Sequence, residues 1–221
     1  LERRVQDRTR ELGVALAEAE RANASKTRFV AAASHDLLQP LSAAKLFLNS
    51  LTEEIESSAG QDVLAKTEMA LNSVEQFISA LLDISTLDAD KAVFDVQPIQ
   101  LTHVFNPLRN EMSPLAAQKN IELTVMESSL TVLSDPGYLR RIVQKLLSNA
   151  IRYTDHGKVL LGVRRIGNAA RIEVWDTGKG IAEEDQTRIF KEFERLSPTN
   201  SDKGLGLGLS IVERACKGLG H

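Results

Sequence analysis

This chain of 221 residues is poor in cysteine, in aromatic residues and in basic charge. Its single cysteine, Cys216, excludes a disulfide framework and a metal site built from cysteines, and it suits a reducing compartment such as the cytoplasm. The formal net charge is −3, so no basic surplus is available to neutralise the phosphates of a nucleic acid. No apolar run approaches the roughly 18 residues that a membrane helix needs. We therefore expect a cytoplasmic chain with no nucleic-acid partner and no membrane segment.

The first 90 residues have the apolar spacing of helices. Residues 1–28 are charged and contain no proline, and their near-heptad repeat predicts a coiled-coil linker that carries a signal, with a solvated helix as the alternative. From Val30 to Ile55 apolar residues recur at steps of three and four, which predicts a helix packed on other helices. A predicted turn at 57–60 and a second apolar helix follow. One hairpin cannot bury two wide apolar faces, so we expect two copies to pair as a four-helix bundle.

After Asp90 the pattern changes to short β-rich runs that alternate with helical segments. A helix is predicted from Pro136 to about Tyr153, with Asp135 as its N-cap and Pro136 in its first position. The predicted strands are Val93 to Val96, Ile121 to Met126, Lys158 to Ile166 and Arg171 to Trp175. The chain is therefore predicted to have two domains, the first a helical dimerisation domain and the second of the α+β class.

The segment Ser34 to Pro40 places a histidine beside a carboxylate on the first helix. His35 is about 200° of helical rotation from the apolar seam, so we expect it to point to solvent with Asp36 beside it. An ordinary surface histidine is the alternative when this segment is taken alone. Pro40 has no N–H for the carbonyl of Asp36, so the helix should loosen next to the histidine.

A polar stripe is predicted on the helix from Pro136 to Tyr153. Lys145, Asn149 and Arg152 are spaced four and three apart, so they share one face. The amide oxygen of Asn149 suits Mg²⁺, and the two cations suit the phosphates of a polyphosphate. A solvated stripe is the alternative.

Two glycine-rich segments follow. Asp176 ends a predicted strand, and Gly178 and Gly180 behind it allow a tight turn and the close approach of a ligand. The Asp176 carboxylate can accept a hydrogen bond from an exocyclic amine, although Asp and Gly are also common in ordinary turns. In the second segment, three glycines between residues 204 and 208 open an apolar helix, where free N–H groups and the helix dipole attract an anion. The polar segment between the two, with Phe190 and Phe193, predicts a lid.

Together these motifs resemble the sensor histidine kinases of two-component signalling, along essentially the whole chain. The segments similar to the H, N, G1, F and G2 boxes are Phe29 to Leu41, Lys145 to Tyr153, Asp176 to Ile181, Ile189 to Glu194 and Gly204 to Leu209. The resemblance implies a dimeric helical hairpin at 29–90 and a Bergerat-type α/β sandwich ATP-binding domain at 91–221. It is also compatible with the core of a hybrid kinase.

The resemblance implies that ATP phosphorylates His35, with Asp36 as the base, and that His35 passes the phosphoryl group to an aspartate of a response-regulator receiver domain. Gln39 lies where many relatives carry a residue that helps to dephosphorylate this partner. The remaining implied roles are Mg²⁺ ligation by Asn149, phosphate contact by Arg152, packing on the nucleotide by Tyr153, adenine recognition by Asp176, a pocket shaped by Gly178 and Gly180, and nucleotide contacts by Lys145, Lys203, Gly204, Leu205, Gly206, Leu207 and Gly208.

One residue departs from the family pattern. Lys145 occupies a position where the N box usually has asparagine, so a catalytically weak or inactive ATP-binding dimeric scaffold is an open alternative. A gyrase-like, chaperone or mismatch-repair ATPase is a third reading, which the preceding hairpin with His35 disfavours. The sequence opens as if inside a helix and stops before the closing strands of such a domain, so we expect a segment of a longer protein, truncated at its carboxyl end.

Overall fold

The computed structural model describes residues 8, 10, 13–14, 33–34, 36–48, 50–51, 57–87, 93–194 and 206–221. The chain divides into two compact units, Leu1–Ala92 and Val93–His221. Most of the predicted linker at 1–28 lies outside the described residues. Within the described part of the chain, no helix has the length and apolar content needed to cross a bilayer. The predicted domain boundaries after residues 28 and 90 stay predictions.

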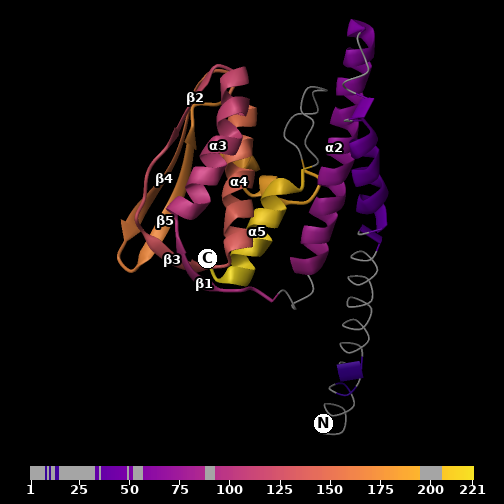
Figure 1. Ribbon diagram of the computed structural model, residues 1–221. Coiled ribbons are helices and arrows are strands. Elements are labelled where there is room, and N and C mark those ends of the chain that lie inside the picture. Colours follow the sequence, from indigo (N-terminus) through magenta and orange to yellow (C-terminus); the bar gives the residue numbers. More distant parts are fainter. Residues whose placement is uncertain are drawn as a thin grey trace. The chain divides into compact units, whose positions relative to one another are not determined.

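The first unit contains two long helices side by side (Figure 1). Residues 36–48 are helical without interruption, and α2 spans Ser58–Leu87. An ion pair between Lys45 Nζ and Glu75 Oε2, 2.6 Å apart, joins the two helices. The buried apolar side chains of this unit are Leu64, Ile78, Ala80 and Ile84.

The predicted turn at 57–60 is wrong for three of its four residues, because α2 already begins at Ser58. Ser57 caps this helix: its hydroxyl Oγ accepts a hydrogen bond from the Gly60 N–H at 3.1 Å. Small polar residues suit a helix start as well as a turn, since both need a side-chain acceptor for free N–H groups. The same composition therefore fits both structures.

A single hairpin leaves a wide apolar surface exposed, as the sequence predicts. Leu46, Phe47 and Val63 are each more than 60% exposed. The described residues around the end of the first helix and the start of α2 line an apolar hollow of about 460 Å³; they are Leu48, Leu51, Ala59, Gly60, Val63, Leu64 and Thr67. Exposed apolar side chains grouped in this way are typical of interaction faces.

The second unit has a sheet covered by helices on one face (Figure 1). In the three-stranded sheet, β2 (Ile121–Val125) runs parallel to β4 (Gly157–Ile166), and β4 runs antiparallel to β5 (Ala169–Asp176). A two-stranded antiparallel sheet joins β1 (Gln97–Gln100) to β3 (Thr131–Ser134). The strands at 121–126, 158–166 and 171–175 are confirmed to within two residues at either end.

The predicted strand at 93–96 is wrong, because these residues have no regular structure and the strand begins at Gln97. Val93 is 92% exposed, so it has no apolar partner that would hold it in a sheet. Ile99 is buried instead and anchors β1 on the core. Pro98 is tolerated because β1 pairs on one side only, with β3.

Three helices complete the second unit: α3 (Thr102–Gln118), α4 (Pro136–Tyr153) and α5 (Gly208–Leu219). Two short 3₁₀ helices, η1 (Glu183–Asp185) and η2 (Arg188–Phe190), lie between β5 and α5 in the chain. Figure 1 shows α3 and α4 over the sheet and α5 against α4. The core between sheet and helices includes the fully buried Phe105, Leu108, Leu147, Val159 and Leu161.

The predicted start of α4 is confirmed. Asp135 Oδ1 accepts a hydrogen bond from the Tyr138 N–H at 3.0 Å, and Pro136 is the first helical residue. The second carboxylate oxygen, Oδ2, accepts from the Asp95 N–H at 2.9 Å. One side chain therefore caps the helix and also holds the segment that enters the unit.

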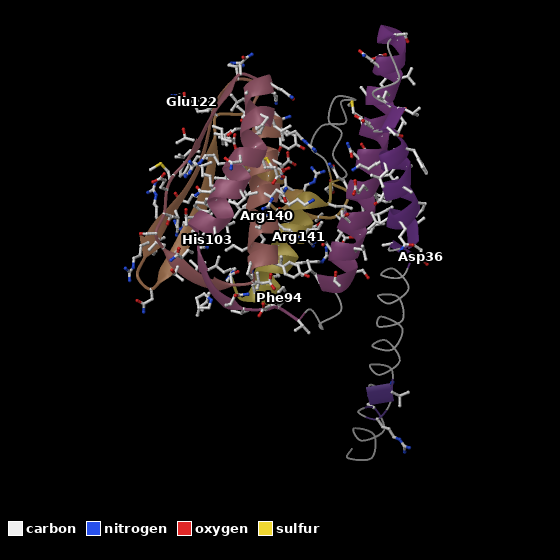
Figure 2. All side chains as sticks on the ribbon, viewed as in Figure 1. Asp36, Phe94, His103, Glu122, Arg140 and Arg141 are labelled. Atoms are coloured by element: carbon white, nitrogen blue, oxygen red, sulfur yellow. The ribbon has the colours of Figure 1, made fainter. Side chains whose placement is uncertain are left out.

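Phe94, the residue before Asp95, packs against the ring of Tyr138 and against Gly218. The Phe94 ring meets the Tyr138 ring edge to face, with 5.0 Å between the centroids. A Cβ on Gly218 of α5 would stand 2.5 Å from Phe94 Cζ, so only glycine allows this contact. Figure 2 shows Phe94 at these helix ends.

Candidate functional site

The polar stripe of α4 lies away from its buried apolar face. Lys145 and Asn149 are half-buried and Arg152 is exposed. The Lys145 side chain passes the first residue of α5, since its Cδ is 3.8 Å from the place where a Cβ on Gly208 would stand. The structure therefore brings the stripe beside the start of α5, as nucleotide binding by both segments requires.

The Asp176 carboxylate is oriented by its own loop. Its register partner in β4 is Val159, which is fully buried, so Asp176 lies on the helix-covered face of the sheet. Asp176 Oδ1 accepts a hydrogen bond from the Gly178 N–H at 2.8 Å. Among the described residues, no donor reaches Oδ2. This oxygen is the acceptor that an exocyclic amine would need.

Gly178 presses the loop against the end of α4. A Cβ at this position would lie 2.5 Å from the Tyr153 carbonyl oxygen and 2.9 Å from Asp176 Oδ1. Gly180 has a φ of 69°, which favours glycine for a different reason. Gly178 is therefore needed for close approach, and Gly180 for its backbone conformation.

Tyr153 is the last residue of α4, and the residue is 39% exposed. Lys179 Nζ lies 5.6 Å from the centroid of this ring, within cation–π range. The next residue, Thr154, is fully buried, and its hydroxyl has no hydrogen-bond partner in the described part of the chain. An aromatic side chain at the end of α4, next to a loop with an open carboxylate oxygen, suits an adenine ring and its amine.

The start of α5 contacts the segment that carries Phe193. The Phe193 N–H donates to the Gly206 carbonyl at 3.1 Å, and a Cβ on Gly206 would stand 2.9 Å from the Phe193 carbonyl carbon. Phe193 itself has a φ of 60°, which is uncommon for a residue other than glycine. The structure thus brings the F-box segment and the second glycine segment together at residues 193 and 206.

Ion pairs join side chains of the segment 185–194 to one another and to α5. Arg188 bridges Asp185 at 2.8 Å and Glu194 at 3.2 Å, and Arg214 of α5 pairs with Glu192. Exposed pairs of this kind contribute little each, about 0–1 kcal/mol, but Arg188 fixes two acidic partners at once.

Four predicted site residues lie outside the described part of the chain: His35, Lys203, Gly204 and Leu205. Asp36 and Gln39 lie on the first helix, and both are exposed. Leu207 is almost fully buried, so its side chain packs in the protein and its backbone alone can face a ligand. The assigned roles of all these residues stay predictions.

The sequence alone does not point to Lys119, which the structure places at the end of α4. Its ammonium Nζ donates to the carbonyls of Ile151 at 2.9 Å and of Arg152 and Thr154 at 2.7 Å each. Lys119 follows α3, and a cation there is ordinarily assigned to the end of its own helix. Only the tertiary fold shows that it serves α4.

Two protein families match the chain in separate segments. Residues 25–90 match the family described as "His Kinase A (phospho-acceptor) domain". Residues 134–221 match the family described as "Histidine kinase-, DNA gyrase B-, and HSP90-like ATPase". The first segment includes His35 and the second includes α4, β5 and α5.

Curated relatives match nearly the whole chain. The chain is 34% identical to the circadian input-output histidine kinase CikA of Synechococcus elongatus, over 97% of this chain and 30% of that protein. It is 30% identical to the signal transduction histidine-protein kinase BarA of Escherichia coli K12, over 95% of this chain and 24% of that protein. This chain thus spans less than a third of the length of either relative.

Solved structures agree on the fold. Full-length ShkA in complex with AMPPNP has a TM-score of 0.63 and 26% identity, over 86% of this chain and 41% of that chain. The histidine kinase AdeS of Acinetobacter baumannii has a TM-score of 0.60 and 21% identity, over 84% of this chain and 87% of that chain. The predicted two-domain α+β fold, a helical region followed by an α/β ATP-binding domain, is confirmed. With matches to both its segments and to relatives along nearly its full length, the chain has the core of a sensor histidine kinase: a phosphoacceptor-type domain followed by a histidine kinase-like ATPase domain.

Proposed function

We propose that this chain transfers the γ-phosphoryl group of ATP to His35 and then to an aspartate of a response-regulator receiver domain. The observation that carries the proposal is the Asp176 carboxylate, which the Gly178 N–H orients and which keeps Oδ2 open beside Tyr153. The matches to a phosphoacceptor domain and to an ATPase family support the same reaction. ATP is made and used inside cells, which favours a cytoplasmic location.

The residues of the second unit fit ATP by their chemistry. Asp176 would accept a hydrogen bond from the adenine amine, and Tyr153 would cover one face of the base. Arg152 and Lys145 would meet the phosphates, and the free N–H groups at the start of α5 would add to this attraction. Lys145 is directed along Gly208, which supports a phosphate contact over the inactive alternative.

Asn149 is the residue that would hold Mg²⁺. Mg²⁺ prefers oxygen ligands, and it is often held by one or two protein ligands together with substrate phosphates and water. Among the described residues, no group of three His, Cys, Asp or Glu side chains could hold a metal ion. Bound Mg²⁺ would neutralise charge on the phosphates during transfer.

Phosphoryl transfer to His35 forms a bond between an imidazole nitrogen and the γ-phosphorus while the bond to the bridging oxygen of ADP breaks. The proton on the other imidazole nitrogen must be held or removed as the ring becomes positive. Asp36 is the neighbouring carboxylate that would take this part, with a contribution of about 10² to 10⁴ in rate. In a separate reaction, Gln39 would orient a water that attacks the phosphorus of the phosphorylated receiver aspartate, so that the acyl phosphate bond breaks, the carboxylate is regenerated and inorganic phosphate leaves.

The test is incubation with γ-labelled ATP and Mg²⁺. We expect a label that is acid-labile and alkali-stable, as phosphohistidine is, on the wild type and none on His35→Ala. Label on both proteins would place the phosphate elsewhere. Binding of ATP with no label on the wild type would identify the chain as the inactive scaffold.

We also propose that two copies pair through the hairpin, because Leu46, Phe47 and Val63 leave a broad apolar face exposed on one copy. Light scattering on the wild type should give twice the mass of one chain. The double variant Leu46→Asp, Phe47→Asp should give the mass of a single chain. A wild-type mass of one chain across the micromolar range would contradict the pairing.

A further inference from the structure

We propose that Lys119 is a positioning residue of the nucleotide site, which holds the last turn of α4 so that Tyr153 and the Asp176 loop meet the base. The inference rests on the proposed ATP-binding function. Lys119 would touch neither nucleotide nor metal, and it acts through the backbone that carries Tyr153.

The Lys119 ammonium uses all three of its N–H donors. They go to the carbonyls of Ile151, Arg152 and Thr154, at 2.7–2.9 Å. The last carbonyls of a helix have no partner within it, and a cation there is favoured by the helix dipole. The Thr154 N–H serves the Ala150 carbonyl. Lys119 thus serves the carbonyls on both sides of Tyr153.

The Lys119 side chain is not needed by its own helix. At the end of α3, the backbone N–H of Lys119 donates to the Ala116 carbonyl, and the N–H of Asn120 donates to the Ala117 carbonyl. Asn120 has a φ of 54°, so the chain turns at once into β2. The Lys119 ammonium therefore bonds to the end of α4, more than 30 residues further along the chain.

A continuous series of contacts leads from Lys119 to the base-recognition carboxylate. The two carbonyls that flank Tyr153 are held by the ammonium, and the Tyr153 carbonyl lies against Gly178. The Gly178 N–H in turn orients Asp176. At a contact in which a Cβ would stand only 2.5 Å from the oxygen, a shift of a few tenths of an ångström in this turn moves the loop as well.

The alternative is a helix cap that contributes stability alone. Two variants separate these roles: Lys119→Met keeps most of the stem and removes the donors, and Lys119→Gln keeps two N–H donors on a shorter chain. Lys217→Met is the matched control, because Lys217 also lies in the last turn of a helix, α5, and its ammonium pairs with Glu213 of the same helix at 2.9 Å.

The experiment measures ADP binding with Mg²⁺ by calorimetry, and thermal unfolding on the same samples. We expect Lys119→Met to weaken ADP binding about 5- to 30-fold, in keeping with the loss of charge-assisted hydrogen bonds. Lys119→Gln should weaken it by less, and Lys217→Met should stay within about twofold of the wild type. If Lys119→Met does not fold, the ADP affinity of Lys119→Gln is compared with those of the wild type and Lys217→Met, and a loss specific to Lys119→Gln supports the proposal.

A double-mutant cycle tests the route through the end of α4 and Gly178 to the carboxylate. In the Asp176→Asn background, we expect Lys119→Met to weaken ADP binding by clearly less than it does in the wild type, because both changes act on the same base-recognition group and coupled sites are not additive. Full multiplication of the two losses would overturn the proposed route. A lowered unfolding temperature with unchanged ADP affinity would leave Lys119 as a plain cap. A wild type that binds no ADP would contradict the proposed function itself.

Discussion

The carbonyl of Tyr153 and the α-carbon of Gly178 meet so closely that no side chain fits between them. A Cβ at residue 178 would lie 2.5 Å from the carbonyl oxygen, well inside van der Waals contact. The end of α4 and the loop after β5 therefore meet at a single glycine. This contact sets the distance between the aromatic residue and the carboxylate proposed to recognise adenine.

Gly178→Ala should weaken nucleotide binding and stability together. Overpacking of this kind costs about 1–3 kcal/mol, and the loop cannot retreat without moving Asp176. ADP titration and thermal unfolding measure the two effects. Gly167→Ala is the control, because Gly167 has a positive φ but nothing within 4 Å of its would-be Cβ. It should lower stability only. Equal ADP affinity in wild type and Gly178→Ala would contradict the close-contact argument.

Asp176→Asn should lower ADP affinity about 10- to 100-fold while the fold is kept. The amide oxygen can still accept from Gly178, but an NH₂ group then replaces the oxygen that would accept from the adenine amine. Calorimetry with ADP checks the loss, and circular dichroism checks the fold. Undiminished ADP binding by the folded variant would remove Asp176 from adenine recognition.

Lys145→Met should weaken ATP binding about tenfold through loss of a cation at the phosphates. Adenosine lacks phosphates, so its affinity should be unchanged in the same variant. Competition binding with the two ligands, repeated at two salt concentrations, measures the contrast. A parallel loss for adenosine would show that Lys145 supports the pocket and not the phosphates. A gain in ATP affinity would support the reading that lysine perturbs this site.

Cys216 should react slowly with alkylating reagents. Burial raises the pKa of its thiol above the ordinary 9.0, so less thiolate is present in the folded chain. The unfolded chain releases this proton first, so the stability that the thiol contributes is full below about pH 9 and is lost as the pH rises through the folded pKa. Alkylation rates at pH 8 with and without denaturant check the first point. Cys216→Ser should remove this part of the alkaline stability loss, and an unchanged pH profile would contradict it.

Pro40→Ala should slow autophosphorylation severalfold and stabilise the first helix. The helix is continuous over 36–48, yet Pro40 offers no N–H to the Asp36 carbonyl. Alanine restores the hydrogen bond and removes a penalty of up to about 3 kcal/mol. Label incorporation over time and thermal unfolding are the measurements. Unchanged label incorporation would show that loosening beside His35 has no part in the reaction.

Local signals predicted much of the second unit. Asp135 and Pro136 are a cap and a first-turn residue within one short stretch, and α4 begins where they indicate. The glycines at 178, 206 and 208 also lie where close approach or a helix start requires them. The cap depends on neighbours in the sequence, so it can be found without a structure. The glycines can be picked out by residue type, but the contacts that require them, with Tyr153 and Phe193, come from the fold.

Features that depend on distant partners were missed. The strand β3 has only four residues, and it forms because Ile99 of β1 pairs with Val132 on the core. The valines at 93 and 96 have strong strand propensity, but more than half of each side chain is exposed, and neither forms a strand. Lys119 could not be assigned to the site either, because its partners belong to another helix.

The carboxylate of Asp135 bonds to two N–H groups, those of Tyr138 and Asp95, and Phe94 beside it touches both Tyr138 and Gly218. Two consecutive residues, Phe94 and Asp95, thus contact the amino end of α4 and the carboxyl end of α5. A movement of the chain at residues 94 and 95 would displace both α4 and α5. It would act at the end of α4 opposite to Tyr153 and at the end of α5 opposite to Gly208. The entry to the second unit therefore joins these two helix ends, so a displacement there cannot reach one helix without reaching the other.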